Sequence, residues 1–179
     1  MKRLFIALSA VCSLGVLVFV WLQSDSDRFR NNVPCGIEVE STGFAASDYT
    51  GIGGPGDFFV IFAVFDIAES TAEHVNNSGV SFLQNLHCQK STLHHQGRPK
   101  KYFSWKTSPS LLQTQNTKEK FASISEYLSK RNMYLDIPPE ILIAAQNALS
   151  TSGNFIGEQN NGFFILDSGN KKAYYLFSN

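Results

Sequence analysis

The C-terminal stretch Gly162–Phe177, "GFFILDSGNKKAYYLF", consists of two apolar runs on either side of a short polar segment. That segment, Asp167-Ser168-Gly169-Asn170, is made of residue types that favour tight turns. Two apolar runs joined by such a turn are typical of a β-hairpin. The chain is therefore predicted to end in two antiparallel strands.

A second apolar stretch, "FFVIFAVF" at Phe58–Phe65, predicts a central strand. It is rich in aromatic and β-branched residues, has turn-forming residues at both ends, and is too short to cross a membrane. Because its apolar residues do not alternate with polar ones, both faces of this strand should be buried. Further strands are expected at residues 35–41, where apolar and acidic residues alternate, and at residues 100–106 and 154–158.

Three helices are expected between these strands. Ser70 and Glu73 fit a capping box, which predicts a helix start there and an apolar stripe that continues to Leu86. Gly79 lies within this stripe, where it either allows close packing or breaks the helix. Amphipathic patterns predict the other two helices at residues 116–130 and 137–149, and Gly153 is a natural stop for the last one.

The order and kinds of these elements predict an α+β fold. We expect a mixed or mostly antiparallel sheet of about five strands with about three helices packed on one face, preceded by an N-terminal transmembrane helix. The chain has 179 residues, of which 43% are hydrophobic. This is enough for one sizeable core but not for two full domains.

Residues 1–22 differ in composition from the rest of the chain. Lys2 and Arg3 precede an uncharged apolar run, residues 4–22, that is long enough to cross a membrane as a helix. The positive residues before this run and the acidic residues after it predict a cytoplasmic N-terminus and an outward-facing body.

This pattern predicts a signal-anchor at residues 1–22, a linker at residues 23–32 and a single exported domain at residues 33–179. The expected location is the inner (plasma) membrane of a bacterium, with the domain in the periplasm. The alternative is a cleaved signal peptide and a secreted domain, for which Ser24-Asp25-Ser26 offers a weak cleavage site.

Two cysteines, Cys35 and Cys88, lie outside the apolar N-terminal run. An even pair of cysteines in an exported chain favours a disulfide bond, because the compartment is oxidising. We therefore predict a disulfide between them, closing a loop of about 50 residues and stabilising the fold by about 4 kcal/mol. Two separate buried thiols are the alternative.

The segment at residues 49–59, "YTGIGGPGDFF", is rich in glycine. A phosphate-binding loop needs such glycines after a strand and before a helix, whereas these precede a strand and no Gly-Lys-Ser/Thr follows them. We interpret the segment as a turn whose rim, at Asp48, Tyr49 and Asp57, is a candidate contact surface. No cofactor is expected to bind there.

No catalytic or metal-binding motif is recognisable in the chain. Structural zinc sites usually need four ligands in paired spacings. The candidate ligands in this chain do not have such spacings: His74, His87, Cys88, His94 and His95. We therefore predict no metal ligands and no catalytic residues.

Charges are unevenly distributed along the chain, although the formal net charge is zero. Every formally charged residue in the range 31–89 is acidic, whereas most of the charged residues in the range 90–131 are basic. Basic residues interleaved with aromatic ones can contact an anionic polymer or lipid headgroups, and the candidate contact residues are Arg98, Lys100, Lys101, Tyr102 and Trp105. The alternative is that the basic segment packs against the acidic one within the domain. The balanced charge gives no reason to expect nucleic-acid binding.

These features predict a membrane-anchored, outward-facing domain that works by binding, as an accessory or inhibitor module of the envelope. Its expected partners are the membrane, through the N-terminal helix, and an envelope protein or anionic polymer. One alternative is a small exported hydrolase that uses carboxylates near the glycine-rich loop, namely Asp57, Asp66 and Glu69. Another is a metal-responsive envelope sensor.

Overall fold

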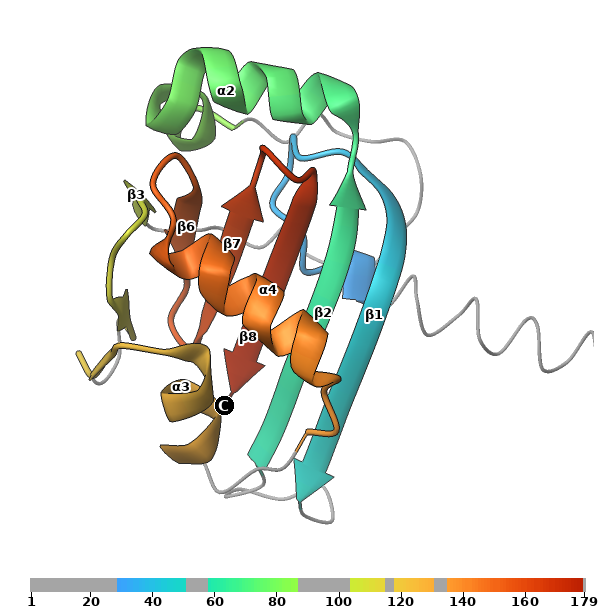
Figure 1. Ribbon diagram of the computed structural model, residues 1–179, viewed down its shortest axis with the longest axis vertical. Coiled ribbons are helices and arrows are strands. Elements are labelled where there is room, and N and C mark those ends of the chain that lie inside the picture. Colours follow the sequence, from blue (N-terminus) through green and yellow to red (C-terminus); the bar gives the residue numbers. More distant parts are fainter. Residues whose placement is uncertain (1–28, 51–57, 87–103, 115–117, 131–134, 179) are drawn as a thin grey trace, which may run out of the picture.

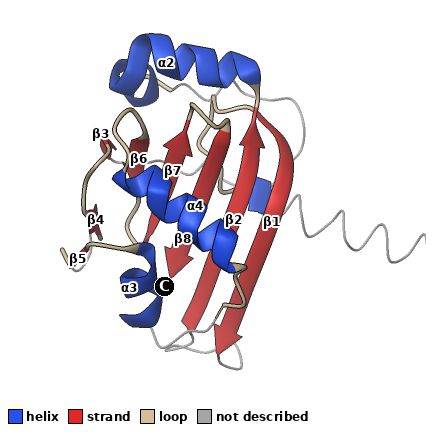
Figure 2. Ribbon diagram, in the orientation of Figure 1, coloured by secondary structure: helices blue, strands red, loops and turns tan. Residues whose placement is uncertain are grey.

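The computed structural model describes residues 29–50, 58–86, 104–114, 118–130 and 135–178. The protein has an α+β fold built on a six-stranded antiparallel sheet with strand order β1-β2-β8-β7-β6-β3 (Figure 1, Figure 2). A second sheet pairs β4 with β5. In chain order the elements are β1 Val39–Thr50, β2 Phe58–Ile67, α2 Glu69–Gln84, β3 Ser104–Thr107, β4 Leu112–Gln113, β5 Lys120–Phe121, α3 Ile124–Lys130, α4 Pro139–Ser150, β6 Phe155–Glu158, β7 Gly162–Asp167 and β8 Lys172–Ser178.

The predicted C-terminal hairpin is confirmed and lies at the centre of the large sheet. Strands β7 and β8 pair antiparallel from Gly162 with Phe177 to Asp167 with Lys172. The other side of β8 pairs with β2. The two apolar runs of the hairpin are therefore covered by strands on both sides as well as by the layers above and below.

Strand β2 is buried on both faces, as its sequence predicted. Ile61, Ala63 and Phe65 belong to one core cluster, whereas Phe62 and Val64 belong to another on the opposite face. This division follows from the alternation of side chains along a strand. The sheet is therefore the middle layer of the molecule.

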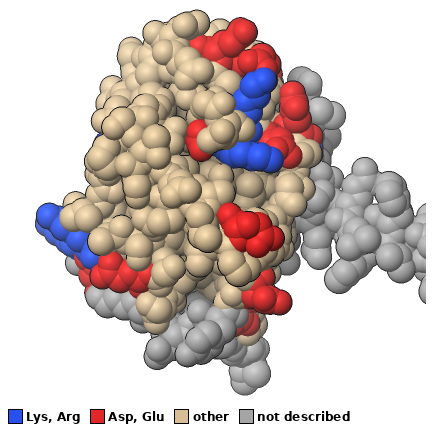
Figure 3. Space-filling model, viewed as in Figure 1, with Lys and Arg blue, Asp and Glu red and all other residues tan. Residues whose placement is uncertain are grey.

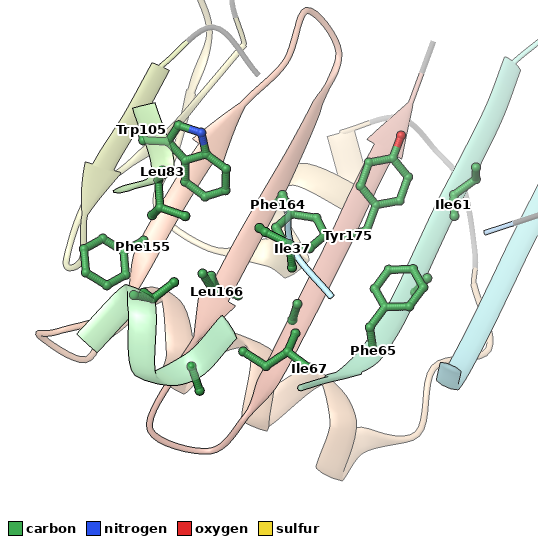
Figure 4. Packing of buried hydrophobic residues seen from close by; sticks show 14 residues of the cluster. Ile37, Ile61, Phe65, Ile67, Leu83, Trp105, Phe155, Phe164, Leu166 and Tyr175 are labelled. Atoms are coloured by element: carbon green, nitrogen blue, oxygen red, sulfur yellow. The ribbon is translucent and has the colours of Figure 1, made fainter. Parts of the chain in front are cut away.

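Helices cover both faces of the sheet, so the predicted arrangement on one face is wrong. Helix α4 crosses one face (Figure 1) and shares a core cluster with side chains of α3. The opposite face is covered by α2, together with Ile37 and Trp105 (Figure 4). The physical reason is that a strand with apolar side chains on both faces leaves one apolar face in water unless both are covered.

Helix α2 is present as predicted, but its N-terminus is not a capping box. The N-cap is Ala68, which makes no side-chain capping bond, and the Ser70 hydroxyl instead donates to Glu38 Oε2 at 3.0 Å. Gly79 has φ 54° and ψ −137°, so the helix is kinked there and Gly79 acts as a break.

The helix predicted at residues 116–130 is wrong in its first half. Within the described residues 118–130, only α3, seven residues long, is helical, and Lys120–Phe121 instead forms β5, which pairs with β4. Phe121 and Ile124 are both buried in the core cluster beneath α4. The apolar spacing of three to four positions, which predicted one long helix, therefore comes from a strand followed by a short helix. Helix α4 and strand β6, in contrast, confirm the predictions at residues 137–149 and 154–158.

Strand β1 begins later and continues further than the predicted strand at residues 35–41. It is an edge strand with register shifts between Val39 and Ser41 and between Thr42 and Phe44. Its last pair, Thr50 with Phe58, encloses residues 51–57, so the glycine-rich segment connects two antiparallel neighbours. The interpretation of this segment as a turn into the central strand is consistent with that pairing.

Trp105 on β3 is a core residue. Its side chain is 7% exposed, lies in the cluster on the α2 face (Figure 4), and makes an edge-on contact with Phe164. The indole covers Gly157, its cross-strand partner. A Cβ atom at Gly157 would lie 2.9 Å from two indole carbons, so this position requires glycine.

Replacing Gly157 with alanine should therefore destabilise the domain by about 1 to 3 kcal/mol, because the indole must leave its site. Urea unfolding followed by Trp fluorescence measures this change. Gly169→Ala is the matched control, since a Cβ atom there meets nothing closer than 3.7 Å. Equal stability of the two variants would contradict the close approach of Trp105.

Candidate functional site

A row of polar side chains crosses four neighbouring strands at one end of the sheet. Ser41 on β1 pairs with Asp66 on β2, Asp66 pairs with Lys172 on β8, and Lys172 pairs with Asp167 on β7. Side chains of directly paired residues lie on the same face of a sheet. Val64 and Tyr174 stand two positions along their strands from Asp66 and Lys172, so they lie on the same face of the sheet as the row. Both belong to the core cluster beneath α4, so the row faces the α4 side.

Both carboxylate oxygens of Asp66 have hydrogen-bond donors. Lys172 Nζ donates to Oδ1 and forms an ion pair with the carboxylate, and the Ser41 hydroxyl donates to Oδ2. These hydrogen bonds, that of Lys172 above all, hold the pKa of Asp66 below its ordinary value of 3.8, against the opposing effect of partial burial. At neutral pH, Asp66 is therefore ionised and held by Lys172 and Ser41.

Asp167 is buried and ordered by its own turn. Its Oδ1 accepts the Asn170 backbone N–H at 3.1 Å, and its Oδ2 accepts the Asn170 side-chain amide at 2.8 Å. The next residue, Ser168, donates its hydroxyl to Asn76 Oδ1 on α2 at 2.6 Å. These bonds fix the β7–β8 turn against α2.

A groove lies between α4 and this turn; we call it the α4 groove. Its main part has a volume of about 780 Å³ and is lined by α4, the residues that follow it, the β7–β8 turn and Asn76 of α2. A hollow of about 200 Å³ adjoins it between α4 and the β1–β2 side of the sheet. Three residues, Ala144, Lys172 and Tyr174, line both parts. Two residues of the polar row, Lys172 and Asp167, therefore lie at the border of the groove.

The floor of the α4 groove carries buried polar groups. Tyr174 is 4% exposed, and burial, with a smaller contribution from the charge of Asp167, raises the pKa of its hydroxyl to about 12. The tyrosine therefore remains a neutral hydrogen-bond donor. Asn154 is also buried and donates its amide to the Ala148 carbonyl at 3.0 Å, which fixes the end of α4.

Most charged side chains on the α4 face lie toward its right side in Figure 3, a smaller group lies at its lower left, and the part between them is largely uncharged. The acidic residues that flank β2 pair with the C-terminal hairpin: Asp66 with Lys172, and Glu69 with Lys171. The prediction that the acidic segment packs against residues 90–131 is therefore not supported for these two residues. Within the basic segment, Lys106 pairs with Glu158 at 2.5 Å.

The predicted contact residues are dispersed or lie outside the described residues. Asp48 and Tyr49 lie at the far end of β1 from Ser41, about 25 Å away at strand spacing. Tyr49 is 49% exposed and contacts Phe59 edge-on. Trp105 is 7% exposed and its indole covers Gly157, so this predicted contact residue is part of the core. The remaining residues fall outside the described part: Asp57, Arg98, Lys100, Lys101 and Tyr102.

The disulfide between Cys35 and Cys88 stays a prediction, because Cys88 lies outside the described residues. The histidines other than His74 also lie outside, and His74 itself contacts the Ser70 carbonyl and the Phe82 ring. Within the described ranges, no three His, Cys, Asp or Glu side chains are grouped as metal ligands.

The predicted membrane anchor at residues 4–22 also lies outside the described residues. Among the helices that are described, none is long and apolar enough to cross a membrane. Comparisons of the chain with protein-family models, with curated proteins and with solved structures found no match.

Sequence reasoning did not find the α4 groove. The lining of its main part comes from three separate parts of the chain, at residue 76, residues 144–154 and residues 167–174, and the polar row joins residues more than a hundred positions apart. One signal was present: Asp66 and Lys172 each stand at the polar end of an apolar strand, where side chains with opposite charges are suitable cross-strand partners.

Acid should weaken the domain through Asp66. Its pKa is lower in the folded than in the unfolded chain, so its contribution is present above the unfolded value of about 4 and is lost as the pH falls through the folded value. The free energy of unfolding of the wild type should therefore decrease below about pH 4 more steeply than that of Asp66→Asn. Urea titrations at a series of pH values measure both slopes, and identical slopes would contradict the ion pair with Lys172.

Proposed function

We propose that this chain is a membrane-tethered domain that faces the bacterial periplasm and works by binding a ligand in the α4 groove. The apolar run at residues 4–22 and its flanking charges support the tether and its orientation. Folded structure begins close behind that run, because Phe29 and Val33 already pack against the core. Residues 23–28 span about 20 Å when extended, so the tether would keep the domain near the membrane surface.

The state of Asp66 is the observation that favours binding over hydrolysis. A general acid or base needs a pKa near the working pH and freedom to exchange its proton. The pKa of Asp66 is lowered, and both of its oxygens accept hydrogen bonds. Glu69 forms an ion pair with Lys171 and is largely exposed. Neither residue is therefore suited to act as half of a catalytic carboxylate pair.

Topology can be tested with fusions at the C-terminus. An alkaline phosphatase fusion should be active and a cytoplasmic fluorescent-protein fusion dark, because the domain is proposed to lie outside the membrane. The full chain should also stay in the membrane fraction after carbonate extraction. Release as a shorter soluble protein would instead support the cleaved signal peptide.

Binding and hydrolysis can be separated with a broad hydrolase screen on the full chain. We expect no turnover by the wild type. Turnover that is lost in Asp57→Ala or Asp66→Ala would overturn the binding function and support the exported hydrolase. Melting curves of both variants must be recorded in parallel, because Asp66→Ala also leaves Lys172 without its ion pair.

A further inference from the structure

We infer that the α4 groove takes a neutral, polyhydroxylated ligand that carries acetamido groups, such as a short chain of N-acetylated amino sugars. This inference rests on the proposed binding function and names its ligand class. It draws on three properties of the groove: the chemistry of its walls, the charges at its border, and its length.

The exposed walls of the groove present amides, hydroxyls and backbone. Asn147 on α4 and Asn170 in the β7–β8 turn face the groove from opposite sides, and Thr151 and Ser152 follow α4. An amide or hydroxyl group can both donate and accept hydrogen bonds. The hydroxyls and acetamido groups of an N-acetylated sugar have the same dual capacity, so they complement these walls.

The charges at the border disfavour an anionic ligand. Among the described residues that line the two parts of the groove, Lys172 is the only cation, and its charge is already matched by Asp66. Asp167 and Glu140 line the groove as well. A polyanion would therefore meet two carboxylates that form no ion pair with any described residue, and the anionic polymer expected from the sequence does not suit this groove.

The walls also disfavour a peptide. Peptides are commonly held by a free strand edge or by pockets for their apolar side chains. Here the walls are a helix and a turn, and Tyr174 on the floor is almost completely covered. Helix α4 has twelve residues and is about 18 Å long, so the groove can accommodate several linked units.

The test uses the full chain in detergent and isothermal titration with three soluble tetramers. These are a fully N-acetylated glucosamine tetramer, its deacetylated cationic form, and a carboxylated anionic sugar of equal length. We expect binding of the acetylated tetramer only. Tighter binding of the cationic or the anionic form would overturn the inference, because charge would then decide recognition.

Ala144→Trp is the variant that should block the groove. Ala144 is exposed on α4 and lines both parts of the groove, so an indole there adds bulk without disturbing the core. The matched control is Ile143→Trp, one position along the helix, where the side chain is 60% exposed and points about 100° away. The affinity for the acetylated tetramer should fall at least about tenfold in Ala144→Trp and stay unchanged in Ile143→Trp.

Equal loss in both variants, or none in either, would overturn the assignment of the ligand to this groove. Should Ala144→Trp melt well below the wild type, Asn147→Ala replaces it, since Asn147 is exposed. If no tetramer binds, the ligand class is wrong. The binding function is then judged separately, by whether a photo-crosslinker at Asn147 captures an envelope component that Ala144→Trp no longer captures. Cleavage of a tetramer by the wild type would overturn binding as the function itself.

Discussion

Replacing Phe164 with alanine should lower the free energy of unfolding by about 3 to 5 kcal/mol, the range for loss of a large buried aromatic side chain. Phe164 is fully buried on β7, next to the centre of the sheet. Its ring stacks on Phe65 with centroids 6.4 Å apart and meets Trp105 edge-on at the same distance (Figure 4). The cavity would thus open on the α2 face of the sheet, among side chains of three strands whose spacing is set by backbone hydrogen bonds.

Urea unfolding at neutral pH measures this loss, with Ile143→Ala as the control. Ile143 is 60% exposed on α4, so its truncation should change stability by no more than about 0.5 kcal/mol. If Phe164→Ala costs as little as the control, the cluster on the α2 face is not a packed core.

The centre of the fold was predictable because it depends on local signals. The turn at Asp167–Asn170 and the apolar runs on each side of it specify the hairpin without reference to the rest of the chain. The uninterrupted apolar run of β2 likewise indicated a strand covered on both faces. That same observation implies helices on both faces, and the prediction of one covered face was inconsistent with it.

The misassigned elements are those in which tertiary pairing overrides a local pattern. Strand β1 continues through Gly43 and Ala45 to Thr50 because β2 offers it a long partner, although these residues have little strand propensity. Strand β5 exists because Lys120 and Phe121 pair with β4. In both cases the partner segment decides the structure, and its register is not visible in a single stretch of sequence.

The candidate site was less predictable than the fold for a related reason. Ser41, Asp66, Lys172 and Asp167 form one row only because three strand pairs share a register. The groove further depends on the path of α4 across the sheet, which loop lengths do not determine. The sequence did draw attention to the glycine-rich loop and the basic segment, but both lie in part outside the described residues.

The pairing of Cys35 with Cys88 stays a prediction, and the structure describes only residues next to them in the chain. Ile37, two residues after Cys35, is part of the core cluster on the α2 face, and Val33 packs against the same cluster. Leu86, two residues before Cys88, packs against it as well. The segment before Cys88 and the segments on either side of Cys35 therefore pack on the same face of the sheet.

Loss of this disulfide should lower the free energy of unfolding by about 4 kcal/mol, because a closed loop of about 50 residues restricts the unfolded chain. Urea unfolding of the full chain with and without dithiothreitol measures the loss, and Cys88→Ser should reproduce the reduced value without reductant. Cys12→Ser is the control, since Cys12 lies in the predicted membrane segment and should not matter. Thiol counting on protein purified from the periplasmic side should find Cys35 and Cys88 unreactive until reduction. Two free thiols, together with no effect of reductant, would contradict the pairing and remove one of the arguments for export.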